Sequence, residues 1–273
     1  GHSHEPLLSS TRNYYSPRWS PSGNRLAYIS THEGRPQIYV RWMDSGRTAL
    51  VSNLAASPSS LTWSPDGTQL AFTMNVDSNE RPFSIKMTAK PKGATWSKPF
   101  QYIDKARYQA DGRGVLDPAY THIFIVPAEG GTARQLTSGN YHHRGTLSFS
   151  ADSQQIFFSA NRSDNWEYEP AEADIFAVDM QGKITQITSV PGREFAPNVS
   201  PDGKMIAYGK RDNKKLAYRN TYLHVMDING RNDRNLSADV DNIVSNYHWR
   251  NNDGLYYQQT RRGITQEDYV SLD

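Results

Sequence analysis

One sequence unit recurs along this chain and constrains its fold more than any other feature. It consists of an aromatic residue or Val, then Ser or Arg, then a short turn rich in Pro, Asp and Gly, then an apolar triplet. The five copies begin at Trp19, Trp63, Phe149, Val199 and Trp249. Because Pro presets φ for a turn and Gly supplies a positive φ, each copy predicts a β-hairpin.

Two further strands are predicted after each hairpin. The third strands are rich in Val, Ile, Leu and Phe, and their cores lie at 38–40, 123–126, 175–178 and 223–226. Each is followed by a glycine turn and a short fourth strand that ends near 51, 137, 188 or 237. Four antiparallel strands repeated in this way are typical of a β-propeller blade, so the sequence predicts an all-β propeller with four full blades.

The spacing of the hairpins locates one insertion. Successive copies lie 44, 86, 50 and 50 residues apart. The long interval holds one blade plus an insertion at about residues 80–118, inside the second full blade. The insertion combines aromatic and basic side chains, namely Trp96, Phe100, Tyr102, Tyr108, Lys90, Lys92, Lys98, Lys105, Arg107 and Arg113. A segment of this kind either shapes a pocket at the propeller cavity or decorates the outside of its blade.

The two ends of the chain predict partial blades. Residues 7–9 resemble a fourth strand without its first three, and residues 269–273 resemble a third strand without a fourth. The chain is therefore expected to be a fragment, or a five-bladed ring closed by pairing of both terminal segments, which would remove an exposed sheet edge. Residues 1–6, which begin with Gly1-His2-Ser3-His4, are interpreted as a cloning remnant and linker, and residues 7–273 as the propeller domain.

Composition excludes several classes of function. There are no cysteines, so disulfides and thiolate metal sites are impossible. The net charge is +2 without a dense basic run, so nucleic acid is not expected as a partner. No cofactor is expected either. No segment approaches the ~20 apolar residues that span a bilayer, so no membrane partner is expected. The compartment stays open between the periplasm or exterior and the cytoplasm of a bacterium.

The hairpin motif resembles a known type of repeat. Trp-Ser-Pro-Asp-Gly at 63–67 followed by Leu-Ala-Phe at 70–72 is similar to the repeats of TolB-like propellers, which also occur in serine peptidases of the prolyl-oligopeptidase family. Three longer segments resemble acylaminoacyl-peptidase and dipeptidyl-peptidase-5-like enzymes. They are residues 89–114, 120–137 and 159–170. The resemblance covers essentially the whole chain after the first few residues.

That resemblance implies a non-catalytic role. In the family the propeller precedes an α/β-hydrolase domain whose Ser-Asp-His triad includes a Gly-x-Ser-x-Gly elbow, and this sequence contains no such elbow. No catalytic residue is therefore expected, and this chain alone is predicted to be inactive, although its parent would be a serine exopeptidase of the acylaminoacyl or dipeptidyl type. The implied partners are a hydrolase domain in cis and a peptide, whose access the propeller would gate and which it would help to recognise.

Four consecutive residues are candidates for substrate binding. Glu167 and Glu169 alternate with Trp166 and Tyr168 in a linker between strands. Two carboxylates beside a cavity can bind the α-ammonium group of a peptide. The segment loosely resembles the Tyr-Glu-Glu sequence of dipeptidyl peptidase IV relatives, although its order is different. The alternative is an ordinary solvated loop with buried aromatic side chains.

Other residues and functions were weighed against these. Five histidines are expected to be scattered over separate blades, so we predict hydrogen-bonded strand residues and no metal site. They are His122, His142, His143, His224 and His248. The repeated aromatics Trp19, Trp63, Phe149 and Trp249 are expected to pack between neighbouring blades. Alternative functions are a stand-alone TolB-like interaction scaffold and a propeller glycan lyase, which would need a cluster of His and carboxylate ligands.

Overall fold

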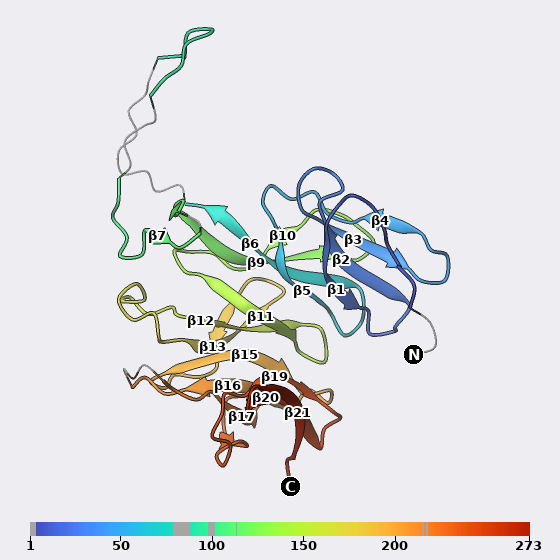
Figure 1. Cartoon of the computed structure of the whole chain (residues 1–273), viewed down its shortest axis with the longest axis vertical. Coiled ribbons are helices and arrows are strands. Elements are labelled where there is room, and N and C mark those ends of the chain that lie inside the picture. Colours follow the sequence, from blue (N-terminus) through green and yellow to red (C-terminus); the bar gives the residue numbers. More distant parts are fainter. Residues whose placement is uncertain (1–3, 79–87, 98–101, 113, 215, 217) are drawn as a thin grey trace.

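A computed structural model describes residues 4–78, 88–97, 102–112, 114–214, 216 and 218–273. The described chain consists of β-strands and loops (Figure 1). The expected blades are four-stranded antiparallel sheets with strand orders β1-β2-β3-β4, β5-β6-β9-β10, β11-β12-β13-β14 and β15-β16-β17-β18, and a fifth blade has the order β19-β20-β21.

The strands of the first two blades have the following bounds. Blade 1 comprises β1 (Tyr14–Trp19), β2 (Arg25–Ser30), β3 (Gln37–Trp42) and β4 (Thr48–Leu50). Blade 2 comprises β5 (Ser59–Trp63), β6 (Gln69–Asp77), β9 (Ala119–Pro127) and β10 (Arg134–Gln135). Between β6 and β9 the insertion forms a small hairpin from β7 (Gln109–Ala110) and β8 (Gly114–Val115).

The remaining blades follow the same plan. Blade 3 comprises β11 (His143–Phe149), β12 (Gln155–Ala160), β13 (Asp174–Asp179) and β14 (Ile184–Gln186). Blade 4 comprises β15 (Arg193–Val199), β16 (Met205–Arg211), β17 (Tyr222–Asp227) and β18 (Arg234–Asn235). Blade 5 comprises β19 (Ser245–Trp249), β20 (Gly254–Arg261) and β21 (Ile264–Ser271). Among the described residues, none forms a helix that could cross a lipid bilayer.

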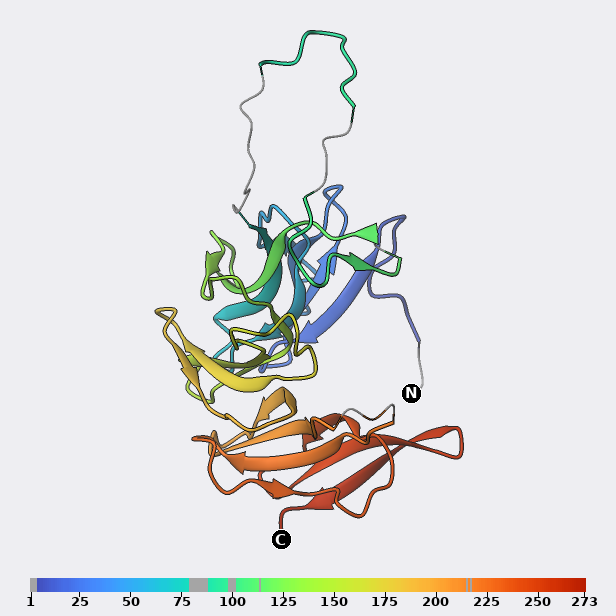
Figure 2. The ribbon, with the colours of Figure 1, turned by 90° about the vertical axis from the view of Figure 1, so that its left-hand side faces the viewer.

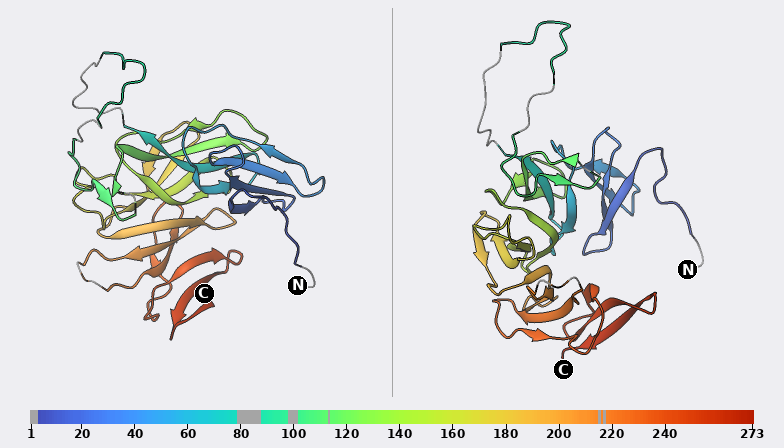
Figure 3. Two further views of the ribbon diagram at one scale, coloured as in Figure 1. Left: turned by 45° about the horizontal axis from the view of Figure 1, so that its top comes forward. Right: turned by 60° about the vertical axis from the view of Figure 1, so that its left-hand side comes forward.

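The five sheets are arranged around an axis as a five-bladed propeller (Figures 1 and 2). The first strands of neighbouring blades contact one another, from β1 to β5, from β5 to β11 and from β11 to β15, so the first strand is the innermost strand in blades 1 to 4. The first and last blades lie apart in each view of Figure 3. Residues 7–9 do not form a strand, so our expectation that they would serve as a fourth strand is wrong.

The hydrophobic core lies between blades. One cluster joins Ile29 and Val40 of blade 1 to Leu61 and Phe72 of blade 2. Similar clusters join blade 2 to blade 3, blade 3 to blade 4, and blade 4 to blade 5. Each blade is thus stabilised mainly by the blades beside it, because a single small sheet buries little apolar surface by itself.

The predicted hairpin turns share one set of hydrogen bonds. The Ser64 hydroxyl donates to Asp66 at 2.6 Å, and the corresponding serines of blades 3 and 4 donate to Asp152 and Asp202 at the same distance. Glycine follows Asp66 and Asp202 at positive φ, and blade 3 has Ser153 at φ 62° in its place. The side-chain bonds hold the turn together, so each hairpin is specified locally by its own sequence.

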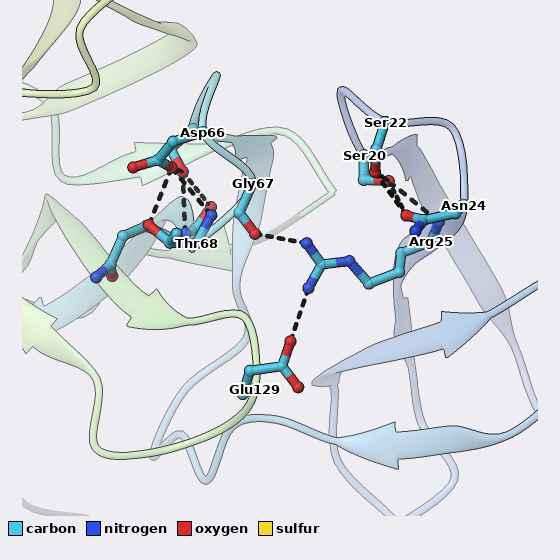
Figure 4. A network of polar contacts seen from close by, with 10 residues as sticks. Ser20, Ser22, Asn24, Arg25, Asp66, Gly67, Thr68 and Glu129 are labelled. Carbon is cyan, nitrogen blue, oxygen red and sulfur yellow. Dashed lines mark hydrogen bonds and ion pairs between the residues drawn. The ribbon is translucent and has the colours of Figure 1, made fainter.

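The turns also connect neighbouring blades (Figure 4). Arg25 of blade 1 donates to the carbonyl of Gly67 at 2.7 Å and forms an ion pair with Glu129 at 2.8 Å, both in blade 2. The same guanidinium lies 4.9 Å from the ring centroid of Trp63. In blades 2 and 4 the amide after the turn proline donates to the next blade, to Ser153 and to Asn252 respectively.

The repeated aromatics pack between blades with one exception. The indole N–H of Trp63 donates to the carbonyl of Arg18, and that of Trp249 donates to the carbonyl of Asn198, each at 2.9 Å and each in the preceding blade. Phe149 is buried. Trp19 is 56% exposed, however, so our expectation that it would pack between blades is wrong. Blade 1 has no preceding blade in this structure to cover the ring.

Every innermost strand contains a β-bulge. In each of the five first strands the register shifts just before the aromatic residue or Val, and one residue near the shift has positive φ. These residues are Ser16, Ser60, Gly145, Ala196 and Asn246, with φ between 48° and 96°. The bulge adds one residue in blades 1, 2, 4 and 5 and two in blade 3, and such additions bend a strand.

Candidate functional site

The loops that follow the second strand in blades 2, 3 and 4 lie at one end of the propeller, on the left in Figure 1. We call this end, opposite the hairpin turns, the loop end. It includes the described parts of the insertion, the β12–β13 loop (161–173) and the described parts of the β16–β17 loop (212–221). The turn end is repetitive, whereas the loop end is different in every blade, so side chains specific to one function are expected there.

A cleft of about 410 Å³ opens at the loop end between blades 2 and 3. Its walls come from the end of β6, the start of β9, the start of β11, the β12–β13 loop and the insertion. Charged side chains of both signs line it. They are Asp77, Asp104, Asp117, Glu167, Lys105, Arg107 and Arg144. This size and mixture suit a few residues of an extended polar chain better than a purely apolar ligand.

One wall of the cleft is aromatic. The indole of Trp166 meets the rings of Tyr120 and His142 edge to face, with centroids 6.3 and 5.5 Å apart. The rings of Tyr120 and His142 are 5.4 Å apart. The three side chains come from three different segments, and such contacts fix ring orientation. The contacts among the three rings therefore hold this wall in one arrangement.

Glu167 connects blade 3 to the insertion. Its carboxylate accepts a hydrogen bond from the Ala106 amide at 3.0 Å and lies 3.4 Å from Lys105 Nζ. Burial would lower the pKa of Lys105, but its contacts with Tyr120 and Glu167 outweigh this and raise the pKa. The Glu167 side chain is only 16% exposed, so its charge is largely used within the protein.

Glu169 and Tyr168 do not share this environment. Successive turns carry the chain outward, since the amides of Tyr168 and Glu169 both donate to the Asn165 carbonyl. Tyr168 is 78% exposed, Glu169 is also exposed, and neither lines the cleft. The structure thus brings Trp166 and Glu167 into the site, but it does not bring the two glutamates together as a pair.

Three of the histidines cluster, contrary to our expectation that they would be scattered. The rings of His122 and His143 are 5.3 Å apart, and His142 lines the neighbouring cleft. His143 Nδ1 lies 3.1 Å from the Thr121 carbonyl, and its Nε2 lies 2.6 Å from a guanidinium nitrogen of Arg162. His143 therefore donates through Nδ1 and accepts through Nε2, which requires the neutral form.

The clustered histidines are held uncharged. Burial is the main cause that lowers the pKa of His143 to about 3, and burial followed by Arg144 lowers the pKa of His142 to about 4. Burial and the charge of Arg162 also lower the pKa of His122. Within the described ranges, no group of three His, Asp or Glu side chains has an arrangement that could hold a metal ion.

The insertion contributes to the cleft with part of its length. Tyr102, Lys105, Arg107 and Tyr108 line it, whereas Trp96, Lys90 and Lys92 do not. Lys98, Phe100 and Arg113 lie outside the described residues. Sequence reasoning missed Asn75, which lines the cleft, and Thr121, which bonds to it. Thr121 donates to Asn75 Oδ1 at 2.8 Å and accepts from Arg144 Nε at 3.1 Å, and no motif marks these positions in the sequence.

Comparison with known protein families agrees with this architecture. Residues 1–116 match the family model described as the TolB beta propeller domain. Residues 94–215 match the model described as the dipeptidyl peptidase IV N-terminal region, and this range contains most of the cleft.

Individual proteins are similar to part of this chain in sequence or to most of it in fold. The uncharacterized peptidase YuxL of Bacillus subtilis is 31% identical over 157 residues, which are 57% of this chain and 23% of that protein. The acylaminoacyl peptidase structure of Pyrococcus horikoshii superposes with a TM-score of 0.70 at 16% identity, covering 94% of this chain and 38% of the other. TolB from Acinetobacter baumannii superposes with a TM-score of 0.54 at 18% identity, covering 98% and 56%. The chain spans less than a quarter of the curated YuxL sequence that it matches.

Proposed function

We propose, from the premise that this chain is a TolB-type β-propeller of the kind found in prolyl-oligopeptidase-family peptidases, that it is the non-catalytic propeller region of a serine exopeptidase. In this role it admits short or unfolded peptides to a catalytic domain of the same protein and contributes contacts to them. The acylaminoacyl and dipeptidyl types of exopeptidase are both compatible with the proposal.

The observation that supports the proposal most is the cleft between the insertion and blade 3. Trp166 offers a preoriented ring for an apolar side chain, and unpaired backbone groups of an extended peptide can bond to the polar walls. A cleft of about 410 Å³ accommodates a few residues but not a folded domain, since domains are tens of ångströms across. Size exclusion of this kind is a physical basis for selecting short peptides.

Glu167 has a different role in this proposal from the α-ammonium recognition that the sequence predicted. Its carboxylate already binds Lys105 and the Ala106 amide. We propose that it positions the insertion so that the cleft keeps its shape, and that Trp166 contacts the peptide. Glu169, which lies outside the cleft, is the matched control.

The full-length protein tests the proposal through steady-state kinetics with aminoacyl and N-acetyl-aminoacyl p-nitroanilides and with tetrapeptides. Trp166→Ala is expected to raise KM for the tetrapeptides about tenfold, since a buried aromatic contact contributes on the order of 1–2 kcal/mol. Glu169→Gln should leave KM within about twofold of the parent. The propeller chain alone should hydrolyse none of these substrates.

Two results would contradict the proposal. Cleavage by the purified 273-residue chain would place a catalytic centre in the propeller. An unchanged KM for Trp166→Ala, with unfolding midpoint also unchanged, would show that substrate does not reach the cleft. A reading frame that lacks a hydrolase domain after residue 273 would instead favour the interaction scaffold.

A further inference from the structure

A second polar site lies at the loop end of blade 4. Arg193, the first residue of β15, is the direct cross-strand partner of Arg211, the last residue of β16. Like charges directly opposite each other in an antiparallel pair destabilise the sheet. The pair therefore calls for an explanation in terms of something that both guanidinium groups bind.

Both guanidinium groups are held in place. Arg193 lies over the ring of Phe195, 5.3 Å from its centroid. That ring in turn lies so close over Gly209 that a Cβ on the glycine would come within 2.8 Å of ring carbons. Arg211 donates to Thr221 Oγ1 at 2.7 Å. Preorganised donors lose little conformational entropy on binding, so the arrangement resembles a prepared recognition site.

The two arginines have no acidic partner among the residues that the structure describes. Neither forms an ion pair, and the Nε of Arg211 is buried without a hydrogen-bond partner. The neighbouring Glu194 is bound to Lys210 at 3.1 Å. Burial and the charge of Arg211 both lower the pKa of Arg193, which is the direction expected for a cation that lacks a counterion.

We propose that the Arg193–Arg211 pair is an anion-binding site for a carboxylate group of an acidic peptide. Two guanidinium groups present parallel N–H donors that match the two oxygens of a carboxylate. The bound carboxylate reduces the repulsion between the arginines.

The surroundings favour a monoanion over a phosphate dianion. Ala173 forms a backbone bridge with Arg193, so Glu172 and Asp174 come directly before and after a residue that is paired with Arg193. Glu194 follows Arg193 in β15 and is buried. Glu194 is neutralised by Lys210, but Glu172 and Asp174 add negative charge to this part of the blade, so a second charge on the ligand would be disfavoured. The site belongs to blade 4, whereas the cleft lies between blades 2 and 3, so the proposal stands whether or not the cleft binds peptides.

NMR spectra of the arginine Nε–H groups of the full 273-residue chain test the proposal. The probes are Ac-Ala-Glu-NH₂, which has a side-chain carboxylate, Ac-Ala-Ala-OH, which has a terminal carboxylate, and neutral Ac-Ala-Gln-NH₂. Saturable movement of the Arg211 signal with either acidic probe supports the site and identifies the source of the carboxylate. An equal response to the neutral probe would overturn it, and tighter binding of inorganic phosphate would overturn the carboxylate assignment.

Variants separate recognition from structure. Arg193→Gln is expected to weaken binding of the acidic probe at least about tenfold, because it removes a charge-assisted pair of hydrogen bonds. Arg231→Gln, which removes a cation from the opposite end of the same blade, should change the affinity less than about twofold. Without ligand, Arg193→Gln should raise the unfolding midpoint by about 1–2 °C, since it relieves the repulsion. A lower midpoint together with unchanged probe affinity would show that the pair is structural.

Discussion

The turn end and the loop end of the blades are built differently. At the turn end the same contacts recur from blade to blade. A Ser–Asp hydrogen bond lies inside the turn, and an indole N–H or a backbone amide donates a hydrogen bond to the adjacent blade. At the loop end each blade has its own residues, among them a neutral histidine cluster in blades 2 and 3 and an arginine pair in blade 4. The turn end therefore fixes the stack of blades, which leaves the loop end free to acquire binding residues.

The largest expected effect tests whether the turn end stabilises the stack. Trp63→Ala should lower the free energy of unfolding by about 3–5 kcal/mol, because it removes a buried indole and its bond to Arg18. Trp19→Ala changes the same blade position where the ring is exposed, and should cost less than about 1 kcal/mol. Urea denaturation of both variants measures the difference. Equal losses would show that Trp19 is covered in solution.

The next effect should appear only at the loop end, as a dependence of stability on pH. The pKa of His143 is about 3 in the folded chain, well below its ordinary value. Between pH 7 and 5 the unfolded chain takes up a proton that the folded chain does not, so the folded state loses about 2 kcal/mol relative to the unfolded state.

Urea denaturation at pH 7 and pH 5 checks this value. His143→Gln should lose correspondingly less stability than the parent on acidification, and His32→Gln, at an exposed position, should behave like the parent. Burial raises the pKa of Asp174 to about 6, which acts in the opposite direction, but this contribution is shared by all three proteins and cancels in the comparison. Parallel losses in parent and His143→Gln would contradict the assignment of a neutral histidine.

A smaller difference in stability is expected between two glycine substitutions, and it distinguishes backbone strain within one turn from steric contact between blades. Gly23 and Gly203 occupy the same turn position in blades 1 and 4, with φ of 71° and 73°. Alanine at either position should cost about 1 kcal/mol from backbone strain. A Cβ at Gly203 would also lie 2.9 Å from the Cβ of Ala151 in blade 3, whereas one at Gly23 meets nothing within 4 Å. Thermal unfolding should therefore show a greater loss for Gly203→Ala, and equal losses would mean that the blade contact is loose.

The smallest effect concerns the connection between blade 3 and the insertion. Glu167→Ala removes a partly exposed ion pair and one hydrogen bond at the edge of the protein, so global stability should change by only about 1 kcal/mol. The insertion should nevertheless open more often, and chymotrypsin should cleave at Tyr102 or Tyr108 about two- to fivefold faster. Glu169→Ala is the control and should be cleaved at the parent rate. Cleavage rates that do not differ would remove Glu167 from its positioning role.

The same contrast explains how much could be predicted from the sequence. The blades were predictable because each turn is specified by a few adjacent residues, such as Ser64, Asp66 and Gly67. The exposure of Trp19 could not be predicted, since it depends on whether another blade covers the ring. The bulges could not be predicted from the sequence, because Ser16 and Ala196 are not residue types that commonly adopt a positive φ.

The candidate site shows the same limit. Trp166 and Glu167 were recognised from their sequence context. The turn that begins at Asn165 directs Glu169 away from Glu167, and the alternation of residue types along the sequence did not predict this turn. The contact of His122 with His143 joins residues of different blades. Only the packing of the blades brings these rings together, and their spacing in the sequence does not predict this contact.

The bulge in every first strand has a consequence for how such a chain can change. One added residue reverses which side of the sheet each later side chain faces. In blades 1, 2, 4 and 5, where one residue is added, the residues before the bulge, such as those at 193–195, therefore face the side opposite to the one that the alternation beyond the bulge predicts. Blade 3 adds two residues, so its alternation is kept. Point substitutions at the positions before the bulge can change which ligand is bound, while the part of each strand beyond the bulge keeps its register. These positions are therefore suitable for a focused mutant library.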